Sequence, residues 1–237
     1  AYGYEIGHIV RSGLDRMYGG QHPDPNVMYY ITVYNEPAVQ PVEPENVDVD
    51  GIVRGIHRIS VGTGPEGAPR ANLFASGVGV AWALEAQQLL RDDWGVAADV
   101  WSVTSWTELR RDGLAADEHN FLHPDAEPRT AYLTEKLRDA TGPVIAVGDW
   151  MHAVADQIRP WVPQRFATLG ADGFGFSDTR AAARRFFKID GPSLVVRTLQ
   201  SLAEEGLVER SRSAEAIEKY RLHDVNAGTS GNAGGES

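Results

Sequence analysis

The sequence predicts an α/β domain of three layers, in which helices cover both faces of a mostly parallel sheet. From residue 51 onward, short apolar segments rich in β-branched residues alternate with longer segments whose apolar residues recur at helical spacing. Strands joined through helices lie parallel, because right-handed crossovers place the helices on the two faces of the sheet. A Gly- and Pro-rich connection at residues 62–69 predicts an antiparallel hairpin, and therefore one antiparallel edge strand.

Residues 1–36 predict a helix followed by a strand. Residues 4–18 carry apolar side chains at helical spacing, and two glycines end the helix. Residues 27–34 are dense in β-branched and aromatic side chains, which is typical of a buried strand. Residues 37–50 are rich in Pro and acidic side chains without periodicity, so they predict a linker and a domain boundary.

The main domain is expected to span residues 51–224. Its predicted elements are strands at 56–61 and 72–76, a helix at 80–94, a strand at 96–103, a helix at 129–140, a strand at 143–147, a helix at 151–161, a strand at 165–169, and helices at 179–187, 193–205 and 213–221. In residues 225–237, Gly, Ser, Asn and Ala replace almost every large apolar side chain. This segment is expected to be a disordered tail.

Composition and charge disfavour several classes of function. The chain has 22 Lys and Arg against 33 Asp and Glu, a net charge of -11, which disfavours nucleic acid and anionic membrane surfaces as partners. No apolar run approaches the length needed to cross a bilayer and no signal peptide is recognisable, so a cytoplasmic location is expected. The absence of cysteine excludes disulfides, thiol nucleophiles and thiolate metal sites.

The most informative segment is the glycine-rich loop at residues 168–180. Gly170, Gly173 and Gly175 permit backbone angles or close approaches that a Cβ would obstruct, and Ser177 or Asp178 is expected to cap a helix that begins near residue 179. We interpret the loop as a structural turn between a strand and a helix. The alternative is an anion site at the helix N-terminus.

This loop and several other segments carry a family resemblance. They are AYGYEI at residues 1–6, GLDRMYG at 13–19, YYITVYNEP at 29–37, GIVRGI at 51–56, SVTSWTELRRDG at 102–113, LHP at 122–124 and ADGFGFSDTR at 171–180. Together they resemble the C-terminal part of the homodimeric, thiamine-diphosphate-dependent pyruvate dehydrogenases. The resemblance implies a transketolase C-terminal-like domain, preceded by the last helix and strand of a pyrimidine-binding domain. It also implies that the chain is a fragment of a longer polypeptide.

The resemblance further implies an activity for the whole polypeptide. The full enzyme would decarboxylate pyruvate on thiamine diphosphate and pass the acetyl unit reductively to lipoyl groups. Thiamine diphosphate and Mg²⁺ would be bound mainly by upstream parts of the polypeptide, so no residue of this chain is expected to be catalytic or to bind the cofactor or the metal. The expected partners are the remainder of the polypeptide, a second subunit of a homodimer, and the dihydrolipoyl acetyltransferase component. The chain itself should shape the dimer and the active-site channel, and should be inactive alone.

Three polar residues are the candidates for the wall of the active site. Asn35 and Glu36 directly follow the predicted strand at 27–34, and Gln40 lies close after them. The resemblance places this loop at the active-site wall. Many relatives carry a His three positions after the Glu, but this chain has Val39, which neither donates nor accepts a proton. A simple turn at residues 35–37 is the competing interpretation.

Three other motifs each have a structural interpretation beside the functional one. The GVG sequence at residues 77–79 sits where a dinucleotide-binding loop would begin, but Trp82 stands at the third glycine position and favours a plain turn. His119 and His123 are four residues apart, yet their loop-like context argues against a zinc site. Asp178 and Arg180 either pair across a domain contact or cap a helix.

The segment at residues 102–113 is interpreted as a subunit interface. Trp101 and Trp106 would be its aromatic anchors, and Glu108, Arg110 and Arg111 its charged rim. A capped helix with exposed charges explains the same residues.

Three other functions are kept open for the chain. The first is a noncatalytic docking or regulatory module for the acyltransferase component. The second is a free-standing nucleotide-binding enzyme that uses the loop at residue 77. The third is part of another thiamine-dependent enzyme, such as a transketolase or a 2-oxoglutarate dehydrogenase.

Overall fold

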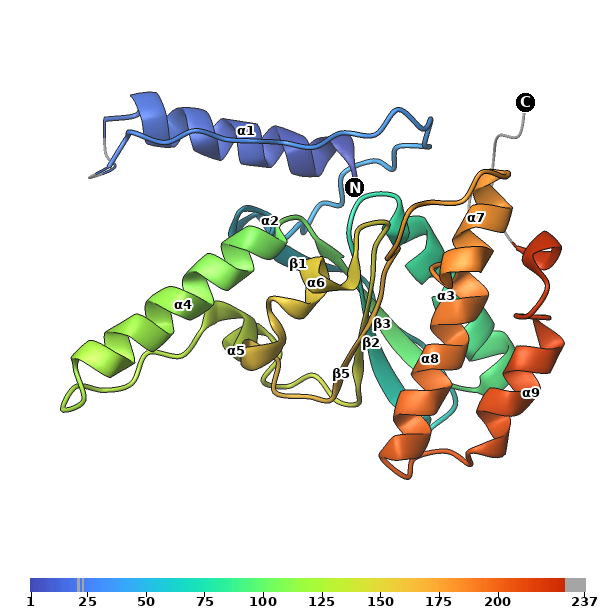
Figure 1. Cartoon of the computed structure of the whole chain (residues 1–237). Coiled ribbons are helices and arrows are strands. Elements are labelled where there is room, and N and C mark those ends of the chain that lie inside the picture. The colour runs from blue at the N-terminus through green and yellow to red at the C-terminus, as the bar shows by residue number, and fades with distance from the viewer. Residues whose placement is uncertain (21, 23, 229–237) are drawn as a thin grey trace.

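A mixed sheet forms the centre of the molecule (Figure 1). The computed structural model describes residues 1–20, 22 and 24–228. Within them, five strands pair in the order β1-β3-β2-β4-β5. Their bounds are β1 (Ile56–Ser60), β2 (Arg70–Ala75), β3 (Ala97–Val103), β4 (Val144–Val147) and β5 (Phe166–Leu169). Strands β2 to β5 run parallel, and β1 lies antiparallel to β3 at one edge. The predicted α/β fold and its antiparallel edge strand are therefore confirmed.

Helices cover the two faces of this sheet. One layer contains α3 (Gly79–Trp94), α8 (Gly191–Glu204) and α9 (Ser211–Lys219), and the other contains α4 (Trp106–Leu122), α5 (Tyr132–Lys136) and α6 (His152–Asp156). Side chains alternate along the strands: Leu73 and Val100 point into the core beneath α3 and α8, whereas Phe74 and Trp101 point into the core beneath α4 and α5. This alternation gives the three layers that the sequence predicted.

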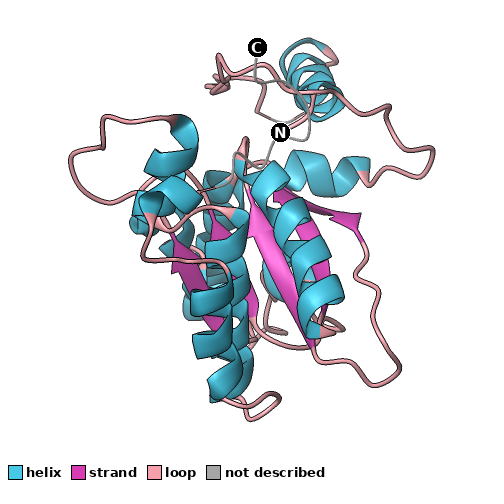
Figure 2. Ribbon diagram, turned by 90° about the vertical axis from the view of Figure 1, so that its right-hand side faces the viewer, coloured by secondary structure: helices cyan, strands magenta, loops and turns pink. Residues whose placement is uncertain are grey.

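The first helix lies outside these layers, beside the carboxyl ends of the parallel strands. Figure 2 shows α1 (Gly3–Tyr18) outside the layered part of the molecule. An extended segment connects α1 to that part. The short helix α2 (Val49–Arg54) packs against α1. A buried hydrogen bond of 2.7 Å between Glu5 Oε1 and His57 Nε2 joins α1 to β1. Burial raises the pKa of Glu5, but the bond to His57 and the amino group of Ala1 outweigh this effect and lower the pKa to about 2.

The predicted hairpin between the first two strands of the sheet is wrong. β1 and β2 do not pair, because β3 lies between them. Every residue of β3 is buried, so this strand needs a neighbour on each side and a helical layer on each face. The connection from β1 to β2 crosses the start of β3, where Gly62 lies so close that a Cβ would be 2.4 Å from the Ala98 nitrogen.

The predicted strand at residues 27–34 is also wrong. The chain is extended over residues 27–34 without strand pairing, and Tyr30 is 90% exposed. A strand exists only where a neighbour accepts its backbone hydrogen bonds, and the described residues supply no neighbour here. The β-branched and aromatic composition of residues 27–34 indicates a preference for strand pairing, but it does not specify which strand would be the partner.

Several boundaries differ from the prediction. The helix predicted at 151–161 is divided into α6 and a 3₁₀ turn, η1 (Arg159–Trp161), which contains Pro160. The helix predicted at 129–140 is reduced to the five residues of α5. Helix α7 (Arg180–Phe187) is capped by Thr179, whose hydroxyl accepts from the Ala182 nitrogen at 3.2 Å, and not by Ser177 or Asp178.

The two proposed flexible segments contain helical turns. α2 begins inside the predicted linker at 37–50. The predicted disordered tail begins with a 3₁₀ turn, η2 (Val225–Ala227), which contacts α7. The remainder of that prediction, residues 229–237, lies outside the described residues.

Candidate functional site

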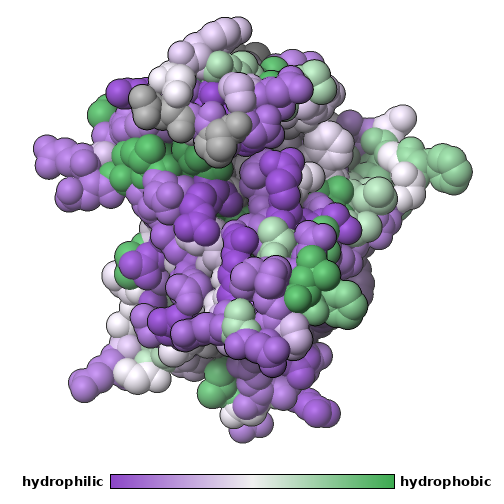
Figure 3. Space-filling view, turned by 90° about the vertical axis from the view of Figure 1, so that its left-hand side faces the viewer, coloured by the Kyte–Doolittle hydropathy of each residue, from purple (hydrophilic) through white to green (hydrophobic). Residues whose placement is uncertain are grey.

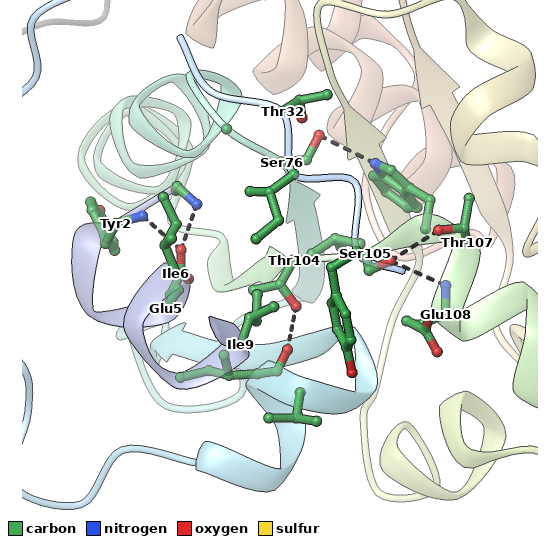
Figure 4. A pocket seen from close by; sticks show the side chains of 18 of the residues that line it. Tyr2, Glu5, Ile6, Ile9, Thr32, Ser76, Thr104, Ser105, Thr107 and Glu108 are labelled. Atoms are coloured by element: carbon green, nitrogen blue, oxygen red, sulfur yellow. Dashed lines mark hydrogen bonds and ion pairs between the residues drawn. The ribbon is translucent and has the colours of Figure 1, made fainter. Parts of the chain in front are cut away.

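A cavity of about 1430 Å³ lies between α1, the extended segment after it, and the carboxyl ends of β2 and β3. Figure 4 shows Tyr2, which precedes α1, and Glu5 of α1 on one side of it, and Ser76 and Ser105 on the other. Loops at the carboxyl ends of parallel strands are where α/β sheets present functional side chains. The cavity is therefore the candidate site.

The hydroxyl groups beside this cavity hold the surrounding loops together. Ser76 Oγ accepts a hydrogen bond of 3.2 Å from Trp106 Nε1, and Thr104 Oγ1 donates to the Ile52 carbonyl at 2.7 Å. Ser105 caps α4 by accepting from the Glu108 nitrogen at 3.1 Å. These partners identify the hydroxyls as structural parts of the cavity wall.

Glu36 is fixed by arginines of α7. Its Oε2 accepts a hydrogen bond of 2.6 Å from Arg184 Nη2, and Arg180 Nε lies 3.8 Å away. The Arg184 and Glu36 side chains are only 9% and 13% exposed, which strengthens their attraction. The Arg184 guanidinium also lies 5.0 Å from the centre of the Trp82 ring. The loop that carries Glu36 is thereby attached to α7, whose Arg184 also contacts α3.

Tyr34 attaches the same loop to the sheet. Its hydroxyl donates a hydrogen bond of 2.9 Å to Asp149 Oδ1, in the loop after β4. Its ring covers Gly77, where an added Cβ would lie 2.3 Å from the ring. Burial and the neighbouring Asp149 carboxylate both raise the pKa of the Tyr34 hydroxyl. Tyr34 therefore stays protonated and able to donate.

The predicted site residues differ in where they lie. Glu36 and Gln40 both line the cavity, and Gln40 Oε1 accepts from the Gly3 nitrogen at 2.8 Å. Asn35 is exposed and is not among the residues that line the cavity. Val39, at the position of the family His, lines the cavity but is 79% exposed.

Sequence reasoning missed the residues that hold this loop in place. Tyr34, Asp149 and Arg184 were not candidates, although Tyr34 directly precedes Asn35. Their partners are 115 and 148 residues away along the chain. No local pattern signals such pairs.

Comparison with known proteins identifies the family. Residues 55–190 match the transketolase-like TK C-terminal domain. The chain belongs to this family. The match covers the sheet together with α3 to α7, so the predicted transketolase C-terminal-like fold is confirmed.

Relatives of this transketolase-like chain are pyruvate dehydrogenase E1 components. Those of Mycolicibacterium smegmatis and Mycobacterium tuberculosis are 54% and 53% identical over 96% of the chain. That of Escherichia coli is 40% identical over 94% of the chain. The chain spans about 24% of the length of each. These matches confirm the resemblance that the motifs indicated.

A solved structure of Leishmania mexicana transketolase is also similar. It is 19% identical, covers 70% of this chain and 20% of its own length, and has a TM-score of 0.44.

The GVG turn at residues 77–79 of the transketolase-like domain lacks the features of a dinucleotide site. Gly77 adopts a φ of +53°, and Tyr34 fills the space beside it that a pyrophosphate would need. Trp82 is buried in the core beneath α3, where a third glycine would have allowed close helix packing. The plain turn is therefore the better interpretation of residues 77–79.

The proposed aromatic anchors of a subunit interface are not on the surface. Trp101 and Trp106 are both buried in the core of this chain. Glu108 pairs with Arg111 on the exposed side of α4. Figure 3 shows a largely hydrophilic surface on the side toward which α4 projects, with separate apolar groups. The aromatic anchors are therefore wrong, the capped helix with exposed charges describes this segment, and a subunit interface at its charged residues stays a prediction.

The described residues hold neither a metal cluster nor a membrane span. Among them, no three His, Cys, Asp or Glu side chains lie close enough to share a metal ion. His119 and His123 stack with ring centres 4.7 Å apart. No helix in the described ranges has the length and apolarity that crossing a bilayer requires.

Proposed function

We propose that this chain is the C-terminal part of a pyruvate dehydrogenase (acetyl-transferring). The whole enzyme decarboxylates pyruvate and reductively acetylates lipoyl groups of the dihydrolipoyl acetyltransferase component, in the cytoplasm. The observation that carries the proposal is the 54% identity to a pyruvate dehydrogenase E1 component over 228 residues. The matched stretch covers 96% of the chain.

The contribution of this chain is architectural. Residues 1–36 complete a pyrimidine-binding domain, residues 37–50 link it, and residues 51–224 form the transketolase C-terminal-like domain of one subunit in a homodimer. Asn35, Glu36 and Gln40 form part of the active-site wall. The ion pair of Glu36 with Arg184 supports this role, because it holds the loop at the carboxyl edge of the sheet. The Val39 side chain has no titratable group, so acid-base chemistry belongs to other segments.

Thiamine diphosphate with Mg²⁺ is assigned to the remainder of the polypeptide. This cofactor supplies the electron sink for the decarboxylation. Among the described residues, no three His, Cys, Asp or Glu side chains lie close enough to share a metal ion. The chemical steps on the cofactor are accordingly proposed for other segments of the polypeptide.

The test compares the full-length protein with the 237-residue chain. Both are assayed for release of carbon dioxide from pyruvate with thiamine diphosphate and Mg²⁺, and for acetylation of an isolated lipoyl domain. Circular dichroism establishes that the shorter chain is folded. We expect activity from the full-length protein alone. Turnover by the shorter chain would overturn the architectural role.

Two further outcomes distinguish the alternative functions. A full-length protein that prefers 2-oxoglutarate to pyruvate would belong to a different thiamine-dependent dehydrogenase. Tight retention of the 237-residue chain by the purified acyltransferase component would instead favour the docking module.

A further inference from the structure

The sheet has a topological switch point between β2 and β4. From β2 the chain passes through α3 on one face to β3, whereas from β4 it passes through α6 on the other face to β5. The loops after these two neighbouring strands therefore diverge and leave a crevice at their carboxyl ends. In doubly wound α/β sheets this crevice is the position where ligands bind.

In this chain a side chain of the same polypeptide occupies that crevice. Tyr34 bridges the two diverging loops: its ring covers Gly77 after β2, and its hydroxyl donates to Asp149 after β4 at 2.9 Å. A Cβ at residue 77 would lie 2.3 Å from the ring, so the loop after β2 accepts Tyr34 only because that residue is Gly.

The position of Tyr34 along the chain connects this contact to the active-site wall. Asn35 follows it directly, and Glu36 is anchored to Arg184 at 2.6 Å. Asn35 therefore lies between two anchors, one on the sheet and one on α7. Losing either anchor leaves Asn35 held on one side only.

We propose that Tyr34 is a positioning residue, which takes the ligand position at the switch point and thereby fixes the loop of residues 35–40. The inference rests on the proposed function, because the loop matters for catalysis only if it lines the pyruvate site. The inference assigns a role to the carboxyl ends of β2 and β4: they hold the loop of residues 35–40 instead of a small molecule.

The test uses Tyr34→Phe in the full-length protein, since this change keeps the ring and removes only the hydroxyl. Tyr220→Phe is the matched control. Tyr220 donates to Asp93 at 2.7 Å, the same kind of bond, but at the opposite end of α3. Asp149→Ala and the Tyr34→Phe/Asp149→Ala double variant complete a double-mutant cycle.

Two measurements are made on each variant. Backbone hydrogen exchange in peptides covering residues 35–40 should become about tenfold faster in Tyr34→Phe and remain unchanged in Tyr220→Phe. The kcat for pyruvate should fall about tenfold while the Kd for thiamine diphosphate stays constant. Asp149→Ala, which removes the acceptor, should produce a similar loss, and the double variant should lose little more than either single variant.

The outcomes separate the two proposals. Unchanged exchange in residues 35–40 of Tyr34→Phe overturns the positioning role. Faster exchange with unchanged kcat also overturns it, because loosening the loop would then have no consequence for the reaction. A wild-type full-length protein that does not act on pyruvate defeats the proposed function, and the exchange data still decide whether Tyr34 holds the loop.

Discussion

Glu36 and Arg184 form an ion pair of 2.6 Å across 148 residues of the sequence. The pair attaches the loop after the first helical segment to α7, a helix of the transketolase-like domain. Because both side chains are largely buried, neither charge is well solvated without the other. The contact therefore supports both the stability of the chain and the position of residues 35–40.

Replacing Arg184 should be costly, whereas replacing its neighbour Arg180 should not. Arg184→Met leaves Glu36 without its main partner, and we expect a loss of about 3 kcal/mol in the free energy of unfolding. The Arg180 side chain is 63% exposed and 3.8 Å from Glu36, so Arg180→Met should cost less than about 1 kcal/mol. Urea unfolding followed by tryptophan fluorescence measures both. Equal losses would contradict the assignment of Arg184 as the main anchor.

The buried pair of Arg185 with Asp190 predicts the largest effect in the core. Arg185 Nε donates to Asp190 Oδ2 at 2.7 Å, and Asp190 also caps α8 through the Ser193 nitrogen. Asp190→Ala removes the cap of α8 and leaves the buried Arg185 guanidinium without its carboxylate partner. We therefore expect a loss of about 4 kcal/mol in the free energy of unfolding, or failure to fold.

The exposed pair of Arg138 with Glu135 is the control for that change. Glu135→Ala should cost less than about 1 kcal/mol. Differential scanning calorimetry compares the two variants. A mild effect of Asp190→Ala would mean that the guanidinium reaches water in the native protein.

Two glycine-to-alanine changes should act in opposite directions. Gly7 lies within α1 with no atom in the path of a Cβ, whereas a Cβ at Gly113 in α4 would lie 2.3 Å from the Trp161 ring. Gly7→Ala should stabilise the chain by about 0.5–1 kcal/mol through helix propensity. Gly113→Ala should destabilise it by about 1–3 kcal/mol through overpacking. The midpoints of thermal unfolding give the two signs, and a stabilising Gly113→Ala would show that Trp161 moves freely.

Acid should weaken the attachment of α1 to β1. The pKa of Glu5 is about 2 in the folded chain, against a usual value of 4.5. Since the folded value is depressed, the carboxylate contributes stability that is complete above about pH 4.5 and is lost as the pH falls toward 2. The size of this contribution is on the order of 3 kcal/mol.

Unfolding free energies between pH 6 and 3 measure this effect in the 237-residue chain. Glu5→Gln should be less stable at pH 6 and should show a shallower decline with acid than the parent chain. Parallel pH profiles of the two proteins would exclude Glu5 as the source of the slope.

Thiamine diphosphate should bind the full-length protein and not this chain. We expect calorimetric titration of the 237-residue chain with thiamine diphosphate and Mg²⁺ to give only heats of dilution, because the described residues lack a metal-binding cluster. The same titration of the full-length protein should saturate. Saturation with the shorter chain would place cofactor ligands within it.

Much of the main domain is predictable from the sequence because its signals are local. β2, β3 and β4 are largely buried on both faces, so they appear as short segments rich in apolar side chains. Apolar periodicity marks two of the helices, α3 between β2 and β3, and α8 after β5. The boundary at residues 37–50 between two domains stays a prediction.

The candidate site is only partly predictable. The family resemblance selected Glu36 and Gln40, which line the cavity, and also Asn35, which does not. It did not select Tyr34 or Arg184, because a residue that holds a loop is recognised by its partner and not by its neighbours in sequence.

By itself the sequence determined most strands and several helices of the main domain, the family, and the three-layer class, since burial and periodicity act over a few residues. The helix α4 (Trp106–Leu122) was not among the predicted elements. The tertiary structure alone decided that β3 separates β1 from β2, that residues 27–34 remain unpaired among the described residues, and that Tyr34 and Glu36 bind Asp149 and Arg184. The reason is physical. Strand pairing and ion pairing depend on which distant segments the packed core brings within about 3 Å of one another, and no local pattern encodes that distance.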